Sequence, residues 1–225
     1  MSLLTLENSH KTKLQALDGA AQAYAGFTVG TAQYPTDIAA LAGNVSAGLL
    51  YVAIGLANEV GELAELFDRE ALSDQFRAER YTKAWKELGD VQWYAARLCD
   101  ELPELPTFRS YVARAYETIT DRPSEVRLSG YDVQSGLCAA AGIILGVVKK
   151  MMRDGADWSP EKREQKIAEL DVALFHVISI SVEFAERTGP LVDCSGGYIG
   201  LLRCNSDKLQ DRKDRGVLKG DGDNR

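Results

Sequence analysis

Apolar residues recur at three- and four-residue spacing along most of this 225-residue chain, and this periodicity limits the folds that it can adopt. Such spacing places apolar side chains on one face of an α-helix, whereas the alternating patterns typical of β-strands are scarce. Ser159 followed by Pro160 suits an N-cap and a first helical turn. We therefore predict an all-α fold, a helical bundle. The predicted helical stretches are Leu49–Phe67, Arg77–Leu102, Thr107–Thr120, Val133–Met152 and Pro160–Arg187.

The composition favours a globular protein, because 45% of the residues are hydrophobic and 26% are charged. A formal net charge of -7 disfavours a surface that binds nucleic acid. The first residues lack the pattern of a secretory signal, and the longest apolar run, Gly136–Val148, is shorter than the roughly 20 residues that span a bilayer. We expect a cytoplasmic protein that binds neither nucleic acid nor membranes. Its four cysteines, Cys99, Cys138, Cys194 and Cys204, are expected to be free thiols.

Two pairs of stretches align as if one helical hairpin occurred twice. AIGLANEVGELAELFD aligns with AAGIILGVVKKMMRD, and KELGDVQWYAARL aligns with AELDVALFHVISI. In this alignment Gly146 and Lys149 take the places of Glu59 and Glu62. We predict one all-α domain, residues 1–225, built from an acidic half, 1–125, and a degenerate basic half with the C-terminal tail, 126–225. Unrelated amphipathic hairpins also align loosely, so the duplication is a hypothesis.

Four acidic residues flank the apolar stripes of two predicted helices. At about 100° per residue, Glu59 lies beside the stripe of its helix, Glu62 lies about 60° further round, and Glu65 faces solvent. On the next helix Glu87 flanks the stripe and Asp90 lies about 60° beyond it. Packing of the two stripes is therefore expected to bring Glu59, Glu62, Glu87 and Asp90 together along one edge of the helix pair.

Carboxylates gathered in this way need neutralisation. Two of them about 4 Å apart repel by about 4 kcal/mol at an effective dielectric constant of about 20. Protonation through raised pKa values is one remedy, and hard divalent cations are the other. The lack of local histidines favours Mg²⁺ or Mn²⁺ over zinc or a di-iron centre. By spacing alone, a solvated acidic face is the alternative interpretation.

The segments GLANEVGELAE and KELGDVQWYAARL resemble the MazG-like, all-α nucleoside triphosphate pyrophosphohydrolases, whose mark is an ExxE and an ExxD helix that hold magnesium. The segments TAQYP at 31–35, KKMMRD at 149–154 and the polar segment 205–225 are similar to the entry segment, basic stretch and tail of phage-type members. The resemblance implies Mg²⁺-dependent hydrolysis of a (deoxy)nucleoside triphosphate between the α and β phosphates, with Mn²⁺ as a substitute. It also implies a homo-oligomer, a dimer or tetramer.

The resemblance assigns metal binding and catalysis to the four acids, Glu59, Glu62, Glu87 and Asp90. The chain departs from the family pattern, because the basic stretch follows the second repeat and not ExxE. This departure suggests a fused pseudo-dimer and leaves open whether its lysines reach the acids. The candidate substrate-binding residues are Lys83, Tyr94, Lys149, Lys150, Arg153, Asn205, Lys208 and Arg212. For each basic residue, an ordinary surface charge is the alternative.

Two other functions are compatible with the sequence. One is a dUTPase-type pyrophosphatase restricted to one base, and the other is a catalytically inactive helical adaptor that uses the bundle for oligomerisation. An inactive scaffold has no reason to keep four carboxylates that repel one another, which disfavours the adaptor. The phage-like segments favour a deoxynucleotide substrate, with dGTP as one candidate.

Overall fold

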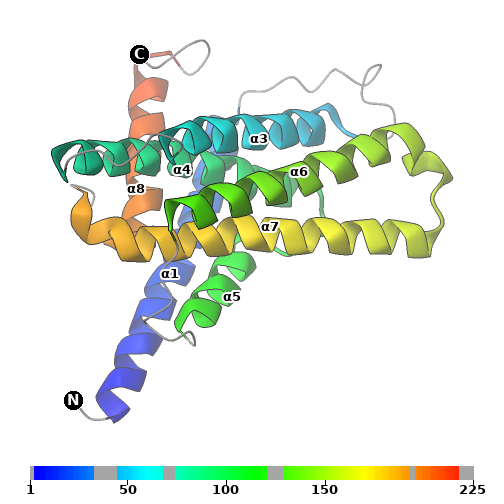
Figure 1. Ribbon diagram of the computed structural model, residues 1–225. Coiled ribbons are helices and arrows are strands. Elements are labelled where there is room, and N and C mark those ends of the chain that lie inside the picture. Colours follow the sequence, from blue (N-terminus) through cyan, green and yellow to red (C-terminus); the bar gives the residue numbers. More distant parts are fainter. Residues whose placement is uncertain (1–2, 33–44, 68–73, 121–128, 193–195, 218–225) are drawn as a thin grey trace.

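The computed structural model describes residues 3–32, 45–67, 74–120, 129–192 and 196–217 (Figure 1). In these ranges the chain forms seven α-helices, two short 3-10 helices and no β-strand, so the predicted all-α fold is confirmed. The elements are α1 (Leu3–Thr31), α3 (Ala47–Phe67), α4 (Asp74–Glu101), α5 (Phe108–Thr120), α6 (Gly130–Asp154), η1 (Gly155–Asp157), α7 (Pro160–Thr188), η2 (Gly189–Leu191) and α8 (Gly197–Asp214).

Helices α3 to α7 coincide with the stretches that the periodicity predicts, apart from a few residues at their ends. Helices α1 and α8 lie outside those stretches. Each of them buries only a narrow apolar face, which includes Leu17, Ala21 and Tyr24 on α1 and Tyr198 and Leu201 on α8. A narrow face between polar residues gives a weak periodic signal, so these helices escape a search for amphipathic stripes.

Two helices begin at the serine caps that their sequences favour. The predicted cap at Ser159 is confirmed, because its side chain accepts a hydrogen bond of 3.2 Å from the backbone nitrogen of Lys162 and Pro160 follows in the first turn. Ser129 and Asp132 form a reciprocal capping box at the start of α6. These caps set where the second helical hairpin begins and turns.

Two helical hairpins, α3–α4 and α6–α7, form a four-helix bundle (Figure 1). Helix α3 also packs against α6, and α4 packs against α7. The hairpins contain the stretches that the proposed repeat aligns, whereas the descent of the two halves from one ancestor stays a prediction. The buried apolar side chains of the described residues form one continuous cluster that extends from α1 to α8.

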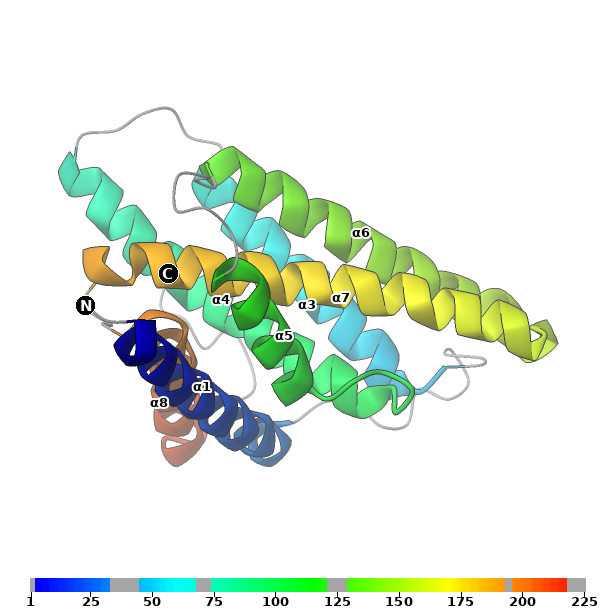
Figure 2. The same cartoon turned by 90° about the horizontal axis from the view of Figure 1, so that it is seen from below.

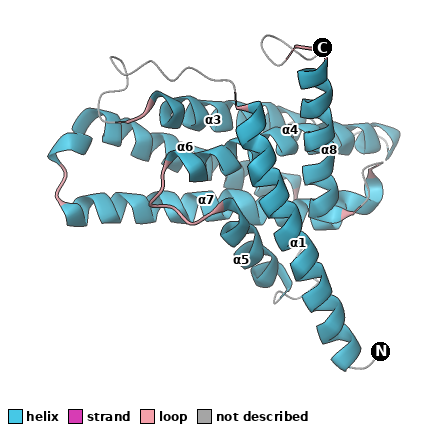
Figure 3. Ribbon diagram, turned by 180° about the vertical axis from the view of Figure 1, so that it is seen from behind, coloured by secondary structure: helices cyan, strands magenta, loops and turns pink. Residues whose placement is uncertain are grey.

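The remaining helices pack around this bundle. Helix α5 contacts α7 and α1, and α8 contacts both α4 and α7. Figures 2 and 3 show α1 and α8 lying side by side against the bundle, with α1 extending beyond it toward the N-terminus. This arrangement brings residues near both ends of the chain to α4, the helix that carries two of the predicted acids.

Buried hydrogen bonds fix α4 against α7 and α8. Gln92 donates through Nε2 to Ser181 Oγ over 2.8 Å, and its Oε1 accepts from the Tyr198 hydroxyl over 2.6 Å. These three side chains are fully buried. Because buried polar groups are costly when unpaired, the network specifies one arrangement of the three helices.

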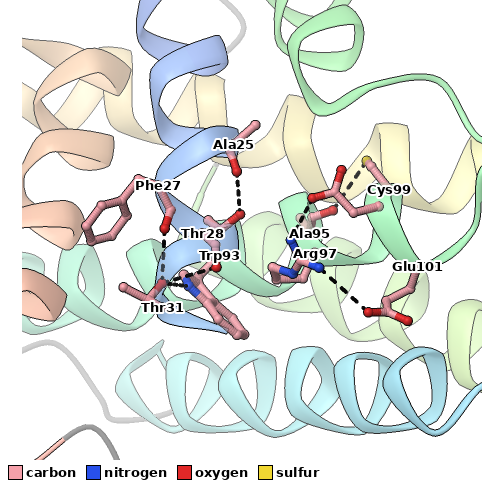
Figure 4. Close-up of polar contacts among 10 residues, drawn as sticks. Ala25, Phe27, Thr28, Thr31, Trp93, Ala95, Arg97, Cys99 and Glu101 are labelled. Carbon is pink, nitrogen blue, oxygen red and sulfur yellow. Dashed lines mark hydrogen bonds and ion pairs between the residues drawn. The ribbon is translucent and has the colours of Figure 1, made fainter. Parts of the chain in front are cut away.

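The end of α1 is joined to α4 by the indole of Trp93. Trp93 Nε1 donates to Thr31 Oγ1 over 2.9 Å, and Thr31 also bonds carbonyl oxygens within α1 (Figure 4). Further along α4, Arg97 pairs with Glu101 at 3.6 Å (Figure 4). The polar edge of Trp93 is therefore engaged within the fold.

Two helices are long and apolar enough to cross a membrane when judged by length and composition: α3 and the continuous segment Gly130–Asp157. Less than half of the most apolar window of each is buried, 44% and 39%, so both also expose apolar side chains such as Ile54 and Ile143. They pack against each other in the bundle core. The cytoplasmic location of the protein stays a prediction.

The prediction of four free thiols is wrong for Cys204, which is disulfide-bonded. Cys99 and Cys138 are free, the first buried and the second exposed. Cys194 lies outside the described residues.

Candidate metal centre

Close contact between α3 and α4 determines which side chains meet at their interface. The ring of Tyr94 on α4 lies directly over Gly55 on α3, where an added Cβ would come within 2.2 Å of a ring carbon. Near the other end of the pair, Glu101 lies equally close to Gly48. The two helices therefore run antiparallel, which places Glu59 at the level of Asp90.

Three of the four predicted acids converge at this interface. Glu59, Glu87 and Asp90 each offer a carboxylate oxygen, and these three oxygens lie within 4.8 Å of one another. We call these residues the acidic trio. All three are half-buried, at the edge of the apolar contact between α3 and α4. The predicted convergence of Glu59, Glu87 and Asp90 is therefore confirmed.

The fourth acid, Glu62, lies beside the trio and is not a member of it. Its Oε1 accepts a hydrogen bond of 3.0 Å from Asn58 Nδ2, one turn earlier on α3. Its charge nevertheless contributes to the electrostatic potential at Glu59. Glu62 is thus close enough to influence the trio, whereas Glu65 is exposed on the solvent side, as predicted.

Within the trio, the pKa of Glu59 is strongly raised. Burial, followed by the charges of Asp90, Glu62 and Glu87, raises the pKa of this carboxyl from 4.5 to about 8, although the charge of Lys208 opposes the increase. At neutral pH Glu59 therefore holds a proton in the absence of a cation. A bound divalent cation would replace that proton, because it stabilises the ionised form of each oxygen ligand.

Helix α8 supplies two predicted polar partners to Asp90. Asn205 donates through Nδ2 to Asp90 Oδ1 over 2.8 Å, and Lys208 Nζ forms an ion pair with Asp90 Oδ2. Both side chains lie on one face of α8, because they are three residues apart. The polar segment that starts at Asn205 therefore begins beside the trio.

Two residues that the sequence reasoning missed complete this contact. Tyr24 on α1 is buried, and its hydroxyl bonds to Asn205 Oδ1 and to the carbonyl oxygen of Gly89, the latter over 3.1 Å. Gly89 leaves room for α8, since an added Cβ would come within 2.9 Å of Asn205. A glycine inside a helix, between two acids, signals such a close approach. No comparable signal marks Tyr24.

The trio fits a hard divalent cation. Oxygen ligands of Mg²⁺ lie 2.0–2.1 Å from the ion, so neighbouring ligands are about 2.9 Å apart and opposite ligands about 4.2 Å apart in an octahedron. The trio oxygens lie within 4.8 Å of one another, so the three carboxylates must draw closer together when they share one ion. Three carboxylate ligands leave coordination positions for water and a substrate phosphate. An all-oxygen donor set favours Mg²⁺ or Mn²⁺.

Three further predicted substrate-binding residues lie on the helices that carry the trio and its partners. Tyr94 is half-buried one turn after Asp90, and its pKa is raised by burial and by Tyr51 and Glu59. Lys83 is exposed, one turn before Glu87 on α4, and Arg212 is half-buried, one turn after Lys208 on α8. Of these three side chains, Tyr94 is the one with an electrostatic interaction with Glu59.

The basic residues of α6 lie elsewhere in the bundle. Lys149 and Lys150 are exposed near the end of α6, whose start packs against Phe67 at the end of α3. Because the two helices are antiparallel, Lys149 is offset from Glu59 along the bundle by about 16 Å. The fold of a single chain therefore does not bring these lysines to the trio.

Arg153 is exposed at the end of the same helix and forms an ion pair with the neighbouring Asp154. It also does not reach the trio within one chain. The segment 33–35 of the predicted entry motif and the tail from 218 onward lie outside the described residues.

A cleft of about 340 Å³ lies between α1 and α8. Its lining is mainly apolar, with Arg203 and Ser206 as polar members. Tyr24, whose hydroxyl bonds to Asn205, also lines this cleft.

No protein-family model matches the chain, and no solved structure matches it. Among curated proteins, the Gene 37 protein of Mycobacterium phage L5 is 34% identical over 94 residues. The match covers 41% of this chain and 74% of that relative. The name of the relative states no activity.

Proposed function

The chain belongs to the family of the Gene 37 protein of Mycobacterium phage L5, and we propose that it is a cation-dependent nucleoside triphosphate pyrophosphohydrolase. In this proposal it cleaves a (deoxy)nucleoside triphosphate between the α and β phosphates and releases a monophosphate and pyrophosphate. The observation that carries the proposal is the convergence of Glu59, Glu87 and Asp90 in a half-buried site that Lys208 and Asn205 adjoin. The sequence resemblance to MazG-like enzymes supports the choice of reaction.

The carboxylates of the trio would hold Mg²⁺ or Mn²⁺, with Glu62 beside them. A bound cation of this kind bridges phosphate oxygens and lowers the pKa of a coordinated water. Glu59, whose pKa lies near neutrality before a cation binds, is poised to exchange its proton for the cation.

The basic groups of α8 would bind the substrate phosphates, whereas the amide of Asn205 is buried and bonded to Asp90 and Tyr24. Lys208 neutralises Asp90 in the absence of a cation, so its ammonium becomes available to a phosphate once a cation takes over that role. Arg212, one turn further along α8, extends the positive charge in the same direction. Lys83 and Tyr94 border the site from α4.

The decisive experiment is a pyrophosphate-release assay over all common ribo- and deoxynucleoside triphosphates, with Mg²⁺, with Mn²⁺ and with EDTA. We expect activity that needs a cation and falls by more than about 100-fold in Glu59→Gln, because loss of an outer partner alone typically costs about 10–100-fold. Glu65→Gln, on the exposed side of the same helix, is the matched control and should retain activity.

The same panel separates the alternatives. Activity on dUTP alone would make the protein a base-restricted dUTPase, whereas dGTP is one candidate for a broader deoxynucleotide preference. A wild-type protein that hydrolyses none of the nucleotides with either cation would refute the proposal and favour a helical adaptor.

A further inference from the structure

We propose that Tyr24 is a positioning residue for the cation site: it orients the amide of Asn205, which in turn holds Asp90. The inference rests on the proposed function, because it presumes that the trio binds a cation. It adds a residue from α1, a helix that carries none of the predicted site residues. It concerns the affinity and geometry of cation binding, so it can be tested without turnover.

A chain of hydrogen bonds links three helices to one carboxylate. The Tyr24 hydroxyl on α1 donates to Asn205 Oδ1 on α8, and Asn205 Nδ2 donates to Asp90 Oδ1 on α4 over 2.8 Å. The hydroxyl also lies 3.1 Å from the carbonyl oxygen of Gly89, the residue before Asp90. Tyr24 is therefore linked to Asp90 in two ways, through the side chain of Asn205 and through the backbone of Gly89.

The direction of these bonds explains why a tyrosine is needed. A carboxylate only accepts hydrogen bonds, so the NH₂ group of Asn205 must face Asp90 and its oxygen must face the opposite way. That oxygen points to Tyr24, whose hydroxyl supplies the missing donor. Without the hydroxyl, the amide oxygen loses its donor and only the bond to Asp90 orients the amide, so Asn205 holds the carboxylate less firmly.

Burial prevents water from replacing the hydroxyl easily. Tyr24 is 2% exposed and Asn205 is 4% exposed. Desolvation, followed by the charge of Asp90, holds the pKa of Tyr24 well above 10, so the hydroxyl keeps its proton at physiological pH. An amide oxygen left unpaired at such a site is destabilising, and the side chain must move to find a partner.

The hydrogen bond from Asn205 leaves Asp90 able to bind a cation. A carboxylate has about four lone-pair sites, and Asn205 and Lys208 engage one on each oxygen. The carboxylate that they hold has an oxygen within 4.8 Å of oxygens of Glu59 and Glu87. Partners of this kind orient a ligand and typically change metal affinity by about 10–100-fold when removed.

The test compares Tyr24→Phe with a matched control, Tyr198→Phe. Tyr198 is also fully buried, and its hydroxyl bonds an amide oxygen, that of Gln92, which has no described bond to the trio. Both variants lose one buried tyrosine hydroxyl that faces α4, so they should lose similar stability. Mn²⁺ affinity of the full chain is measured by titration calorimetry, and the surroundings of the bound ion are observed by electron paramagnetic resonance.

We expect Tyr24→Phe to weaken Mn²⁺ binding about 10–100-fold and to change the spectrum of the bound ion. Tyr198→Phe should stay within about twofold of the wild type. Asn205→Ala should weaken binding at least as much, and the double variant Tyr24→Phe/Asn205→Ala should lose nothing beyond Asn205→Ala, because the two residues act in series.

The outcomes are distinguishable. If the wild type does not bind Mn²⁺, both the proposed function and this inference are refuted. If the wild type binds Mn²⁺ and Tyr24→Phe behaves like Tyr198→Phe, the cation site stands and the role of Tyr24 is refuted. If Tyr24→Phe does not fold, the Asn205→Ala variant tests the proposal instead. An unchanged Mn²⁺ affinity of Asn205→Ala would refute the proposed series of hydrogen bonds.

Discussion

Replacing Glu59 by glutamine should stabilise the cation-free protein and abolish its response to Mg²⁺. The pKa of Glu59 is raised from 4.5 to about 8, first by burial and then by the charges of Asp90, Glu62 and Glu87. Between these two pH values the unfolded chain has released the proton and the folded protein still holds it. The stability of the wild type therefore falls as the pH rises from about 4.5 to about 8. Glutamine does not titrate, so this fall in stability should be absent from Glu59→Gln.

The size of the effect follows from the same numbers. At pH 7, retention of a proton by a group with an unfolded pKa of 4.5 costs the folded state about 3.4 kcal/mol, at about 1.36 kcal/mol per pH unit. Glu59 is only half-buried, so solvent screening reduces this to about 1–2 kcal/mol. For a chain of this length, we expect Glu59→Gln to raise the Tm by about 2–8 °C in EDTA.

Magnesium should reverse the order of the two proteins. A ligand at 100 times its Kd stabilises the folded state by about 2.7 kcal/mol, and only the wild type keeps the full ligand set. Thermal unfolding by circular dichroism, in EDTA and in Mg²⁺ at pH 4.5, 7 and 8, measures both effects. Glu65→Gln is the control and should unfold like the wild type. A lower Tm for Glu59→Gln in EDTA at pH 7, or a gain that does not change with pH, would refute this reasoning.

Three further predictions concern the α8 cation, the α3–α4 contact and assembly. In steady-state kinetics, Lys208→Met should raise the KM for the triphosphate about 10–100-fold. In calorimetry the variant should bind Mn²⁺ no less tightly than the wild type, and weaker Mn²⁺ binding would contradict this prediction. Gly55→Ala should lower the free energy of unfolding in urea by about 1–3 kcal/mol, because the added Cβ meets the Tyr94 ring. Gly61→Ala, whose added Cβ meets nothing within 4 Å, should raise that free energy by up to about 1 kcal/mol. Equal effects of the two substitutions would exclude the close contact at Gly55. Light scattering should detect a dimer or tetramer, and a monomer at every concentration would rule out the predicted homo-oligomer.

Features within single helices could be predicted from the sequence because helix geometry is local. The stripe on α3 and the stripe on α4 follow from a rotation of about 100° per residue, and the positions of Glu59, Glu87 and Asp90 beside those stripes follow with them. The apolar stripes also specify that the two helices pack together. The sequence was therefore sufficient to predict three members of one acidic site.

The relative placement of distant segments could not be predicted in this way, because it depends on packing that no local pattern encodes. Lys149 and Lys208 were equal candidates in the sequence, yet only Lys208 reaches Asp90. The antiparallel order of α3 and α6 moves Lys149 along the bundle, away from Glu59.

The sequence by itself determined the helical class and the position of the carboxylates beside the apolar stripes of α3 and α4, since each depends on residues within one or two turns of each other. Only the tertiary structure decided that α1 and α8 meet over α4, which joins Tyr24 to Asn205 and Asp90. Those residues are far apart in the chain, and a hydrogen bond between them arises only when the whole core has fixed the positions of three helices.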